Sequence, residues 1–158
     1  MEHHRSGAQD CARRLAIEAH SSEISNDVWL VRGIASQYIE GEQISSAAFN
    51  TKEISVAVLS LDSVRRLLEN RDRFRVLAAV KVDYCRKLGL QVLPDPTEYD
   101  PDHVLILLRD LGTGQRKKMG KKLKDAAVTA TVEGPAEEVY GRLRACCDEF
   151  DRIESVGA

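Results

Sequence analysis

Aromatic residues, metal-ligand motifs and long apolar runs are all scarce in this chain of 158 residues. Phe, Trp and Tyr make up 5% of the sequence, which is too few for the extended base-stacking platform of single-strand nucleic-acid binders. No apolar run approaches the length of a membrane span, and the first residues lack the apolar core of a signal peptide. We therefore expect neither membrane insertion nor secretion.

The cysteines show no C-x-x-C pair and no zinc-type spacing. They are Cys11, Cys85, Cys146 and Cys147. A disulfide between the last two would be strained, because adjacent residues cannot easily reach the usual geometry. The acidic stretch at residues 95–102 lacks the glycine and the spacing of a calcium loop. The sequence thus predicts reduced thiols, no metal site and a cytoplasmic location.

The net charge of −2 hides an uneven distribution. Residues 113–124 hold six cations and no acid, namely Arg116, Lys117, Lys118, Lys121, Lys122 and Lys124. The rest of the chain, at −2 minus 6, therefore carries −8. This pattern describes an acidic protein with one basic patch.

The length and the 43% hydrophobic content are enough for one domain with a core. Residues 8–20 repeat apolar side chains at helical spacing. We assign residues 1–22 to an N-terminal segment with this helix, and residues 23–158 to a single globular domain. Apolar and β-branched runs predict strands in that domain; they cover residues 28–34, 53–59, 74–82, 90–94, 103–109 and 127–133.

Helices are expected between several of these strands. Asp62 or Ser63 is predicted to cap a helix that runs to Asn70, and Gly89 to end a short helix over residues 83–89. The basic segment forms another helix, and residues 134–153 form the last one, with Cys146, Cys147 and Ile153 among its inward residues. Because strands and helices intersperse without strict alternation, we predict an α+β fold, a mixed sheet of about five to six strands covered by helices.

The basic helix has two interpretations. Met119 and Leu123 fall on its apolar side, so most of the lysines fit a solvated outer face. Three of the cations, however, stand near the helix start, where the dipole disfavours positive charge, and they follow two glycines that leave N–H groups free to meet a ligand. The candidate anion-binding residues are Gly112, Gly114, Arg116, Lys117, Lys118 and Lys121, and the candidate ligands are phosphate, nucleotide or nucleic-acid backbone.

Three further side chains are candidates for chemistry. Arg32 interrupts an apolar strand, so it is expected either to pair with an acid such as Glu53 or Asp102, or to grip a phosphate or carboxylate. Ser46 lies in a short segment where capping is the simpler role. His103 follows Asp100 and Asp102, and an aspartate would orient it as a general base; a surface histidine is the plainer alternative.

Short motifs give a family resemblance over residues 28–106. The chain has W-x-x-R at Trp29 to Arg32, S-S-x-x-F at Ser45 to Phe49 and P-x-H at Pro101 to His103. It resembles small, standalone bacterial proteins of unassigned function. It is more distantly similar to ADP-ribosyltransferase-like domains, a resemblance that implies NAD as cofactor and assigns Arg32 and Ser45 or Ser46 to its binding. No E-x-E element follows, and Glu98 is the only counterpart of the family's downstream acid.

These observations favour a small cytosolic accessory or interaction protein with an anion-binding surface, which acts by binding nucleic acid or nucleotides. The first alternative is an enzyme that uses NAD or another nucleotide, with Arg32, Ser46 and His103 around one cleft. The second is a pure protein-interaction module that binds a protein partner through the N-terminal helix or the last helix. No cofactor is evident outside the NAD alternative.

Overall fold

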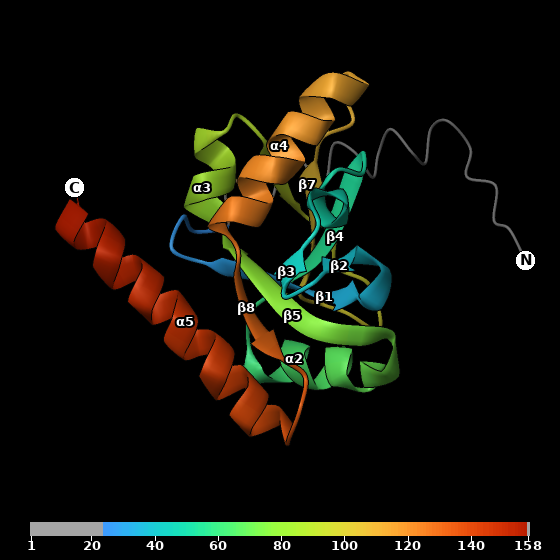
Figure 1. Cartoon of the computed structure of the whole chain (residues 1–158), viewed down its shortest axis with the longest axis vertical. Coiled ribbons are helices and arrows are strands. Elements are labelled where there is room, and N and C mark those ends of the chain that lie inside the picture. The colour runs from blue at the N-terminus through green and yellow to red at the C-terminus, as the bar shows by residue number, and fades with distance from the viewer. Residues whose placement is uncertain (1–23, 158) are drawn as a thin grey trace, which may run out of the picture.

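The computed structural model describes residues 24–157, so the helix predicted over residues 8–20 lies outside the described part of the chain. Its main element is a six-stranded sheet in the order β6-β7-β4-β1-β5-β8 (Figure 1). The strands in chain order are β1 (Trp29–Ala35), β4 (Glu53–Val58), β5 (Phe74–Lys81), β6 (Gln91–Pro94), β7 (His103–Leu107) and β8 (Val128–Thr131). The fold is α+β, and each strand starts within one residue of its predicted start.

The sheet is antiparallel at every pairing, not mixed as predicted. The helical connection from β4 to β5 does link two strands that run in the same direction, as a parallel unit would. β1 lies between these two strands, however, and pairs antiparallel with both. The crossovers are therefore present, but each joins strands that are not neighbours.

Side chains alternate between the two faces of the sheet, and helices cover both (Figure 1). One face, here called the α4 face, packs on α3 (Val82–Lys87) and α4 (Thr113–Ala126) through residues such as Leu30 and Ile54. The other, the α5 face, packs on α2 (Leu61–Leu68) and α5 (Ala136–Gly157) through residues such as Trp29 and Val31. The domain has apolar packing on both sides of one sheet, which explains the nearly continuous apolar strands.

The helix ends confirm one predicted cap and correct another. Gly89 follows α3 with φ of 82°, the left-handed conformation that glycine adopts without strain. α2 is capped by Ser60 rather than by Asp62 or Ser63, since the Ser60 hydroxyl accepts a hydrogen bond from the Ser63 N–H. The Ser63 hydroxyl in turn accepts a hydrogen bond from the Ser60 N–H, so Ser63 completes a capping box from inside the helix.

Two residues of α5 that were predicted to face the core are exposed instead. Cys147 is fully buried as predicted, but its neighbour Cys146 is exposed. A step of about 100° per residue separates adjacent helix positions, so only one of the two faces the sheet. Ile153 is 60% exposed, because the last turns of α5 extend beyond the sheet (Figure 1).

A short hairpin and a 3-10 turn cover part of the α4 face. The hairpin joins β2 (Ile39–Glu40) to β3 (Gln43–Ile44) across Gly41, whose φ is 63°. The 3-10 helix η3 (Ser46–Phe49) follows and packs beneath α4. The smaller 3-10 turns η2 (Ser36–Tyr38) and η4 (Arg71–Arg73) lie just after β1 and just before β5.

The sheet edge at β8 is covered by side chains of α5. Arg142 Nη2 donates to the carbonyl oxygens of Thr131 and Glu133, and the Cys146 thiol donates to that of Thr129. These groups occupy main-chain acceptors that would otherwise be open to another strand. At the opposite edge, β6 ends in Pro94, which has no N–H to offer a partner.

Candidate functional site

The glycine turn before α4 is open to solvent. Gly112 is the N-cap residue and provides no side-chain cap, so the first N–H groups of the helix have no side-chain acceptor from that position. A Cβ placed at Gly112 or Gly114 would meet nothing within 4 Å. The turn therefore has room for a ligand, although no described side chain encloses it.

Arg116 stands near the start of α4 for a local reason. Its Nη1 donates to the Leu111 carbonyl oxygen at 2.8 Å, and its Nη2 approaches Thr113 Oγ1 at 3.4 Å. The guanidinium thus folds back over the turn and binds an acceptor outside the helix. This contact offsets part of the unfavourable interaction between a cation and the helix dipole.

Three lysines of α4 face solvent without ion-pair partners. Lys117, Lys118 and Lys121 are exposed, and no lysine of α4 forms an ion pair within residues 24–157. Gly120 and Leu123 form the buried side of the helix. The outcome is a cationic surface, here called the α4 lysine face, made of Lys117, Lys118 and Lys121.

Ser46 lies beneath this helix rather than in a cleft. A Cβ at Gly120 would be 2.9 Å from the Ser46 carbonyl oxygen, so α4 and η3 approach each other backbone to backbone. The adjacent Ser45 caps η3, since its hydroxyl accepts from the Ala47 N–H. The serine segment has the capping role that its sequence suggested, and Ser46 borders none of the cavities discussed below.

Arg32 extends to the α4 face and forms no ion pair with a carboxylate in the described part of the chain. Its Nη1 donates to the Ala48 carbonyl oxygen at 2.6 Å, and its guanidinium carbon lies 5.9 Å from the Phe49 ring centre. Its Nε is buried and has no hydrogen-bond partner, and burial lowers the pKa of the guanidinium.

The two acids proposed as partners of Arg32 bind other arginines instead. Asp102 pairs with Arg66 at 2.7 Å, and Glu53 with Arg109 at 3.4 Å. Arg66 and Arg109 lie outside the apolar strand that contains Arg32. In the folded chain they are the arginines that reach Asp102 and Glu53. The predicted pairing of Arg32 is therefore corrected to a carbonyl and an aromatic ring.

His103 is oriented by an aspartate, but not by either of the two that precede it. Its Nδ1 lies 3.1 Å from Asp95 Oδ2 and 3.1 Å from the Asp95 carbonyl oxygen. Asp95 is 7% exposed and follows β6, the hairpin partner of β7, which starts at His103. Pairing of β6 and β7 brings the two together, and no spacing rule in the sequence indicates this pair.

A cavity of about 270 Å³ opens beside His103 on the α5 face of the sheet. Arg32 and His103 both border it, so two of the three predicted catalytic residues share a cavity, although the Arg32 guanidinium binds on the opposite face. The wall includes Ser55, Leu67, Phe74 and Asp100. Ser46, Gly112 and Gly114 are not part of it.

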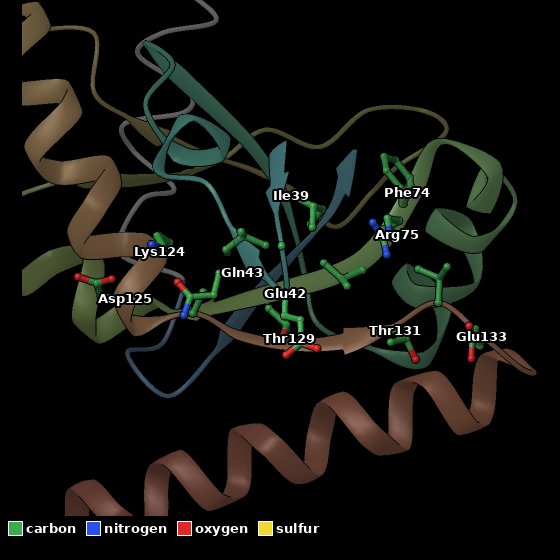
Figure 2. Close-up of a pocket in the computed structure, with 15 residues that line it drawn as sticks. Ile39, Glu42, Gln43, Phe74, Arg75, Lys124, Asp125, Thr129, Thr131 and Glu133 are labelled. Atoms are coloured by element: carbon green, nitrogen blue, oxygen red, sulfur yellow. The ribbon is translucent and has the colours of Figure 1, made fainter. Parts of the chain in front are cut away.

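A larger groove, of about 580 Å³, lies between the β2–β3 hairpin and the β5–β8 edge. Figure 2 shows Lys124 and Asp125 at one end and Arg75 at the other, with Thr129 and Thr131 along β8. Glu42 and Glu133 add negative charge to the lining. Because cations and acids alternate along it, this groove does not select a ligand of one charge.

No three His, Cys, Asp or Glu side chains within residues 24–157 come close enough to hold a metal ion. No helix of that region has the length and apolar character to cross a membrane.

The described cysteines differ in accessibility, and we predict that they differ in reactivity. Burial raises the pKa of the Cys85 and Cys147 thiols to about 12, whereas Cys146 is exposed. In a Cys11→Ser variant at pH 8, a thiol reagent should modify one thiol quickly in the native protein and three in denaturant. Equally fast modification of Cys85 in native protein would contradict the packing.

The same thiols should make stability depend on alkaline pH. An unfolded cysteine ionises near pH 8.5, while the two buried ones stay protonated to about 12. The contribution of these two protonated thiols to the free energy of unfolding is complete below about pH 8.5. It is lost progressively as the pH rises toward 12, because in that range only the unfolded state releases the thiol protons. Urea unfolding at pH 7 and pH 10, with Cys85→Ala as control, measures this loss.

Comparisons of the chain with protein-family models, with curated proteins and with solved structures found no match.

Proposed function

We propose that the protein binds the phosphate backbone of nucleic acid through the α4 lysine face, and that it acts by binding. The observation that carries this proposal is that Lys117, Lys118 and Lys121 are exposed and unpaired on a chain that is otherwise acidic. A lysine without a carboxylate partner attracts polyanions, and the release of condensed counterions drives such binding.

The surroundings of the lysines support backbone contacts rather than base recognition. The only large hydrophobic side chains exposed within residues 24–155 are Tyr99 and Ile153, and neither belongs to α4. Without aromatic side chains on this face, bases have nothing to stack on. The proposed ligand is therefore a duplex, bound without sequence preference.

The test compares wild-type protein with Lys117→Glu/Lys118→Glu/Lys121→Glu. Binding to a fluorescent duplex is measured by anisotropy between 50 and 200 mM salt. Wild-type binding should weaken steeply with salt, and the loss of three phosphate contacts should reduce the slope of log K against log salt by about 3.

A matched control reverses three cations elsewhere, in Arg73→Glu/Arg144→Glu/Arg152→Glu. These substitutions change the net charge by the same amount, but the three residues lie on η4 and α5. The control should keep most of the wild-type affinity. The proposal fails if both triple variants lose affinity equally, if wild type shows no salt-dependent binding, or if it binds anionic vesicles but no duplex.

One observation supports the alternative of an NAD-using enzyme, since Arg32 and His103 border one cavity. The volume of about 270 Å³ is below the roughly 300–1,000 Å³ of pockets for drug-sized ligands, so a whole dinucleotide does not fit there. The protein-interaction alternative lacks an extended exposed apolar surface in the described region, because Tyr99 and Ile153 stand alone. We therefore place nucleic-acid binding first.

A further inference from the structure

The cavity beside His103 arises because β1 and β4 separate. Their ladder contains only the pairs Leu30 with Val58 and Val31 with Ala57. Beyond these pairs, β1 continues to Ala35 alongside β5, and β4 reaches back to Glu53 alongside β7. The two strands thus leave a gap between Gly33 and Ser55, and both of these residues border the cavity.

Main-chain groups point into this gap. In an antiparallel sheet, the N–H and C=O of one residue point to the same neighbouring strand, and the direction alternates along the chain. The Trp29 carbonyl accepts from the Leu59 N–H, so odd-numbered residues of β1, including Gly33, point toward β4. The Lys52 carbonyl accepts from the Leu108 N–H on the β7 side, so Ser55 points toward β1. The N–H and C=O groups of Gly33 and Ser55 therefore face the gap without a ladder partner.

Ser55 and His103 are diagonal neighbours on the α5 face. Ser55 stands opposite Leu105, and His103 stands opposite Ala57. Diagonal positions of this kind have Cβ atoms about 7–8 Å apart or less, so rotation of the serine hydroxyl and the imidazole can bring the two within hydrogen-bond reach. Ser55 is exposed, and its hydroxyl makes no hydrogen bond within the described residues.

Asp95 fixes the direction of the imidazole. β7 lies between β6 and β4, and Asp95, at the end of β6, holds Nδ1 at 3.1 Å. With Nδ1 turned toward β6, the opposite edge of the ring with Nε2 is directed toward β4 and the cavity. An aspartate on Nδ1 fixes the tautomer in which Nε2 accepts a proton, and it stabilises the imidazolium that forms.

We propose that Ser55, His103 and Asp95 form a hydrolytic site for short-chain acyl esters. Ser55 Oγ attacks the acyl carbon and forms a new C–O bond, while its proton passes to His103 Nε2. The bond to the leaving alcohol then breaks, and the alcohol takes that proton. His103 then deprotonates a water that attacks the acyl carbon; the bond to Ser55 Oγ breaks, and His103 returns the proton to Oγ, which releases the carboxylic acid and free Ser55. The N–H groups of Gly33 and Ser55 bind the oxyanion of each tetrahedral intermediate.

The cavity also sets the class of substrate. Its apolar wall of Val31, Leu67 and Phe74 and its small volume suit a short acyl group. Asp100 borders it as well, and its Oδ1 is buried without a hydrogen bond, with Arg66 Nη2 at 3.4 Å as the paired cation. The negative charge of Asp100 beside the cavity disfavours an anion, so uncharged acyl esters are favoured over anionic ones.

The first experiment uses a fluorophosphonate probe, which phosphonylates an activated serine, with peptide mass spectrometry to locate the label. Wild type should be labelled at Ser55, and Ser55→Ala should not be labelled. Ser46→Ala is the matched control, because Ser46 lies on the opposite face of the sheet and should leave labelling unchanged. No labelling of wild type, or a label on another residue, overturns the proposal.

The second experiment measures hydrolysis of 4-nitrophenyl acetate and butyrate. Ser55→Ala should fall to the uncatalysed background, and His103→Gln should lose roughly 10²–10⁴-fold in kcat. Asp95 acts as a positioning residue, so Asp95→Asn should lower kcat and leave KM unchanged. Equal activity of Ser55→Ala and wild type would show reaction with surface nucleophiles and reject the site. Circular dichroism checks that each variant is folded, and the α4 lysine variant should retain full esterase activity.

Discussion

Replacing Trp29 by alanine is expected to lower the free energy of unfolding by about 3–5 kcal/mol, the usual cost of removing a buried indole. The side chain is 1% exposed and meets Phe150 edge to face, with 5.3 Å between ring centres. Its Nε1 donates to Asp151 Oδ2 at 3.3 Å. Asp151 also binds Lys81 Nζ at 2.7 Å, so the indole connects β1 to a charged pair between β5 and α5.

Urea denaturation followed by circular dichroism measures this loss, since the variant lacks the only tryptophan of the chain. Trp29→Phe is the matched variant. It retains most of the apolar contact but cannot donate to Asp151, so it should lose less, with about 1 kcal/mol assigned to the hydrogen bond. A loss below about 1 kcal/mol for Trp29→Ala would mean that α5 does not pack on β1 as described.

Replacing Gly33 by alanine is expected to lower the free energy of unfolding by about 1–3 kcal/mol through overpacking. A Cβ at this position would lie 2.5 Å from two atoms of the Phe74 ring. The ladder between β1 and β5 shifts its register between Ile34 and Ala35, and Phe74 then pairs with Ala35. The ring rests on the glycine, so even one methyl group forces the ring or the strand to move.

A double-mutant cycle with Phe74→Leu separates this contact from other effects of the substitution. Gly33→Ala should cost much less in the Phe74→Leu background, because the clashing ring is gone. Gly141→Ala on α5 is the control: a Cβ there meets nothing within 4 Å, so it should stabilise the helix by about 0.5–1 kcal/mol. Equal costs of Gly33→Ala in both backgrounds would contradict the contact with Phe74.

Local sequence patterns were sufficient for the six strands of the main sheet and for the longer helices, but not for the β2–β3 hairpin or for the arrangement of the elements. Apolar runs predicted the strands, and Gly89 predicted the end of α3, because these signals depend on neighbouring residues. The insertion of β1 between β4 and β5 depends on pairing between distant segments. A mixed sheet and an antiparallel one have the same local pattern here, so the sequence did not distinguish them.

The candidate sites also depend partly on local sequence patterns and partly on pairing between distant segments. Basic residues are visible in any sequence, so the α4 lysine face could be anticipated, and its role in binding remains a prediction. Asp95 was missed as the partner of His103, since the pair depends on the β6–β7 hairpin. Ser55 was missed because it looks like an ordinary polar position in an alternating strand. Only the separation of β1 from β4 gives that position a cavity.

The contact between Trp29 and Asp151 also affects how fast the chain folds. These residues are 122 positions apart, so the α5 face closes only after a very large loop has been ordered, and domains with such distant contacts fold slowly. Until α5 docks, the main-chain acceptors of Thr129 and Thr131 lack the donors from Cys146 and Arg142. Docking of α5 therefore also closes the β8 edge against pairing with other chains.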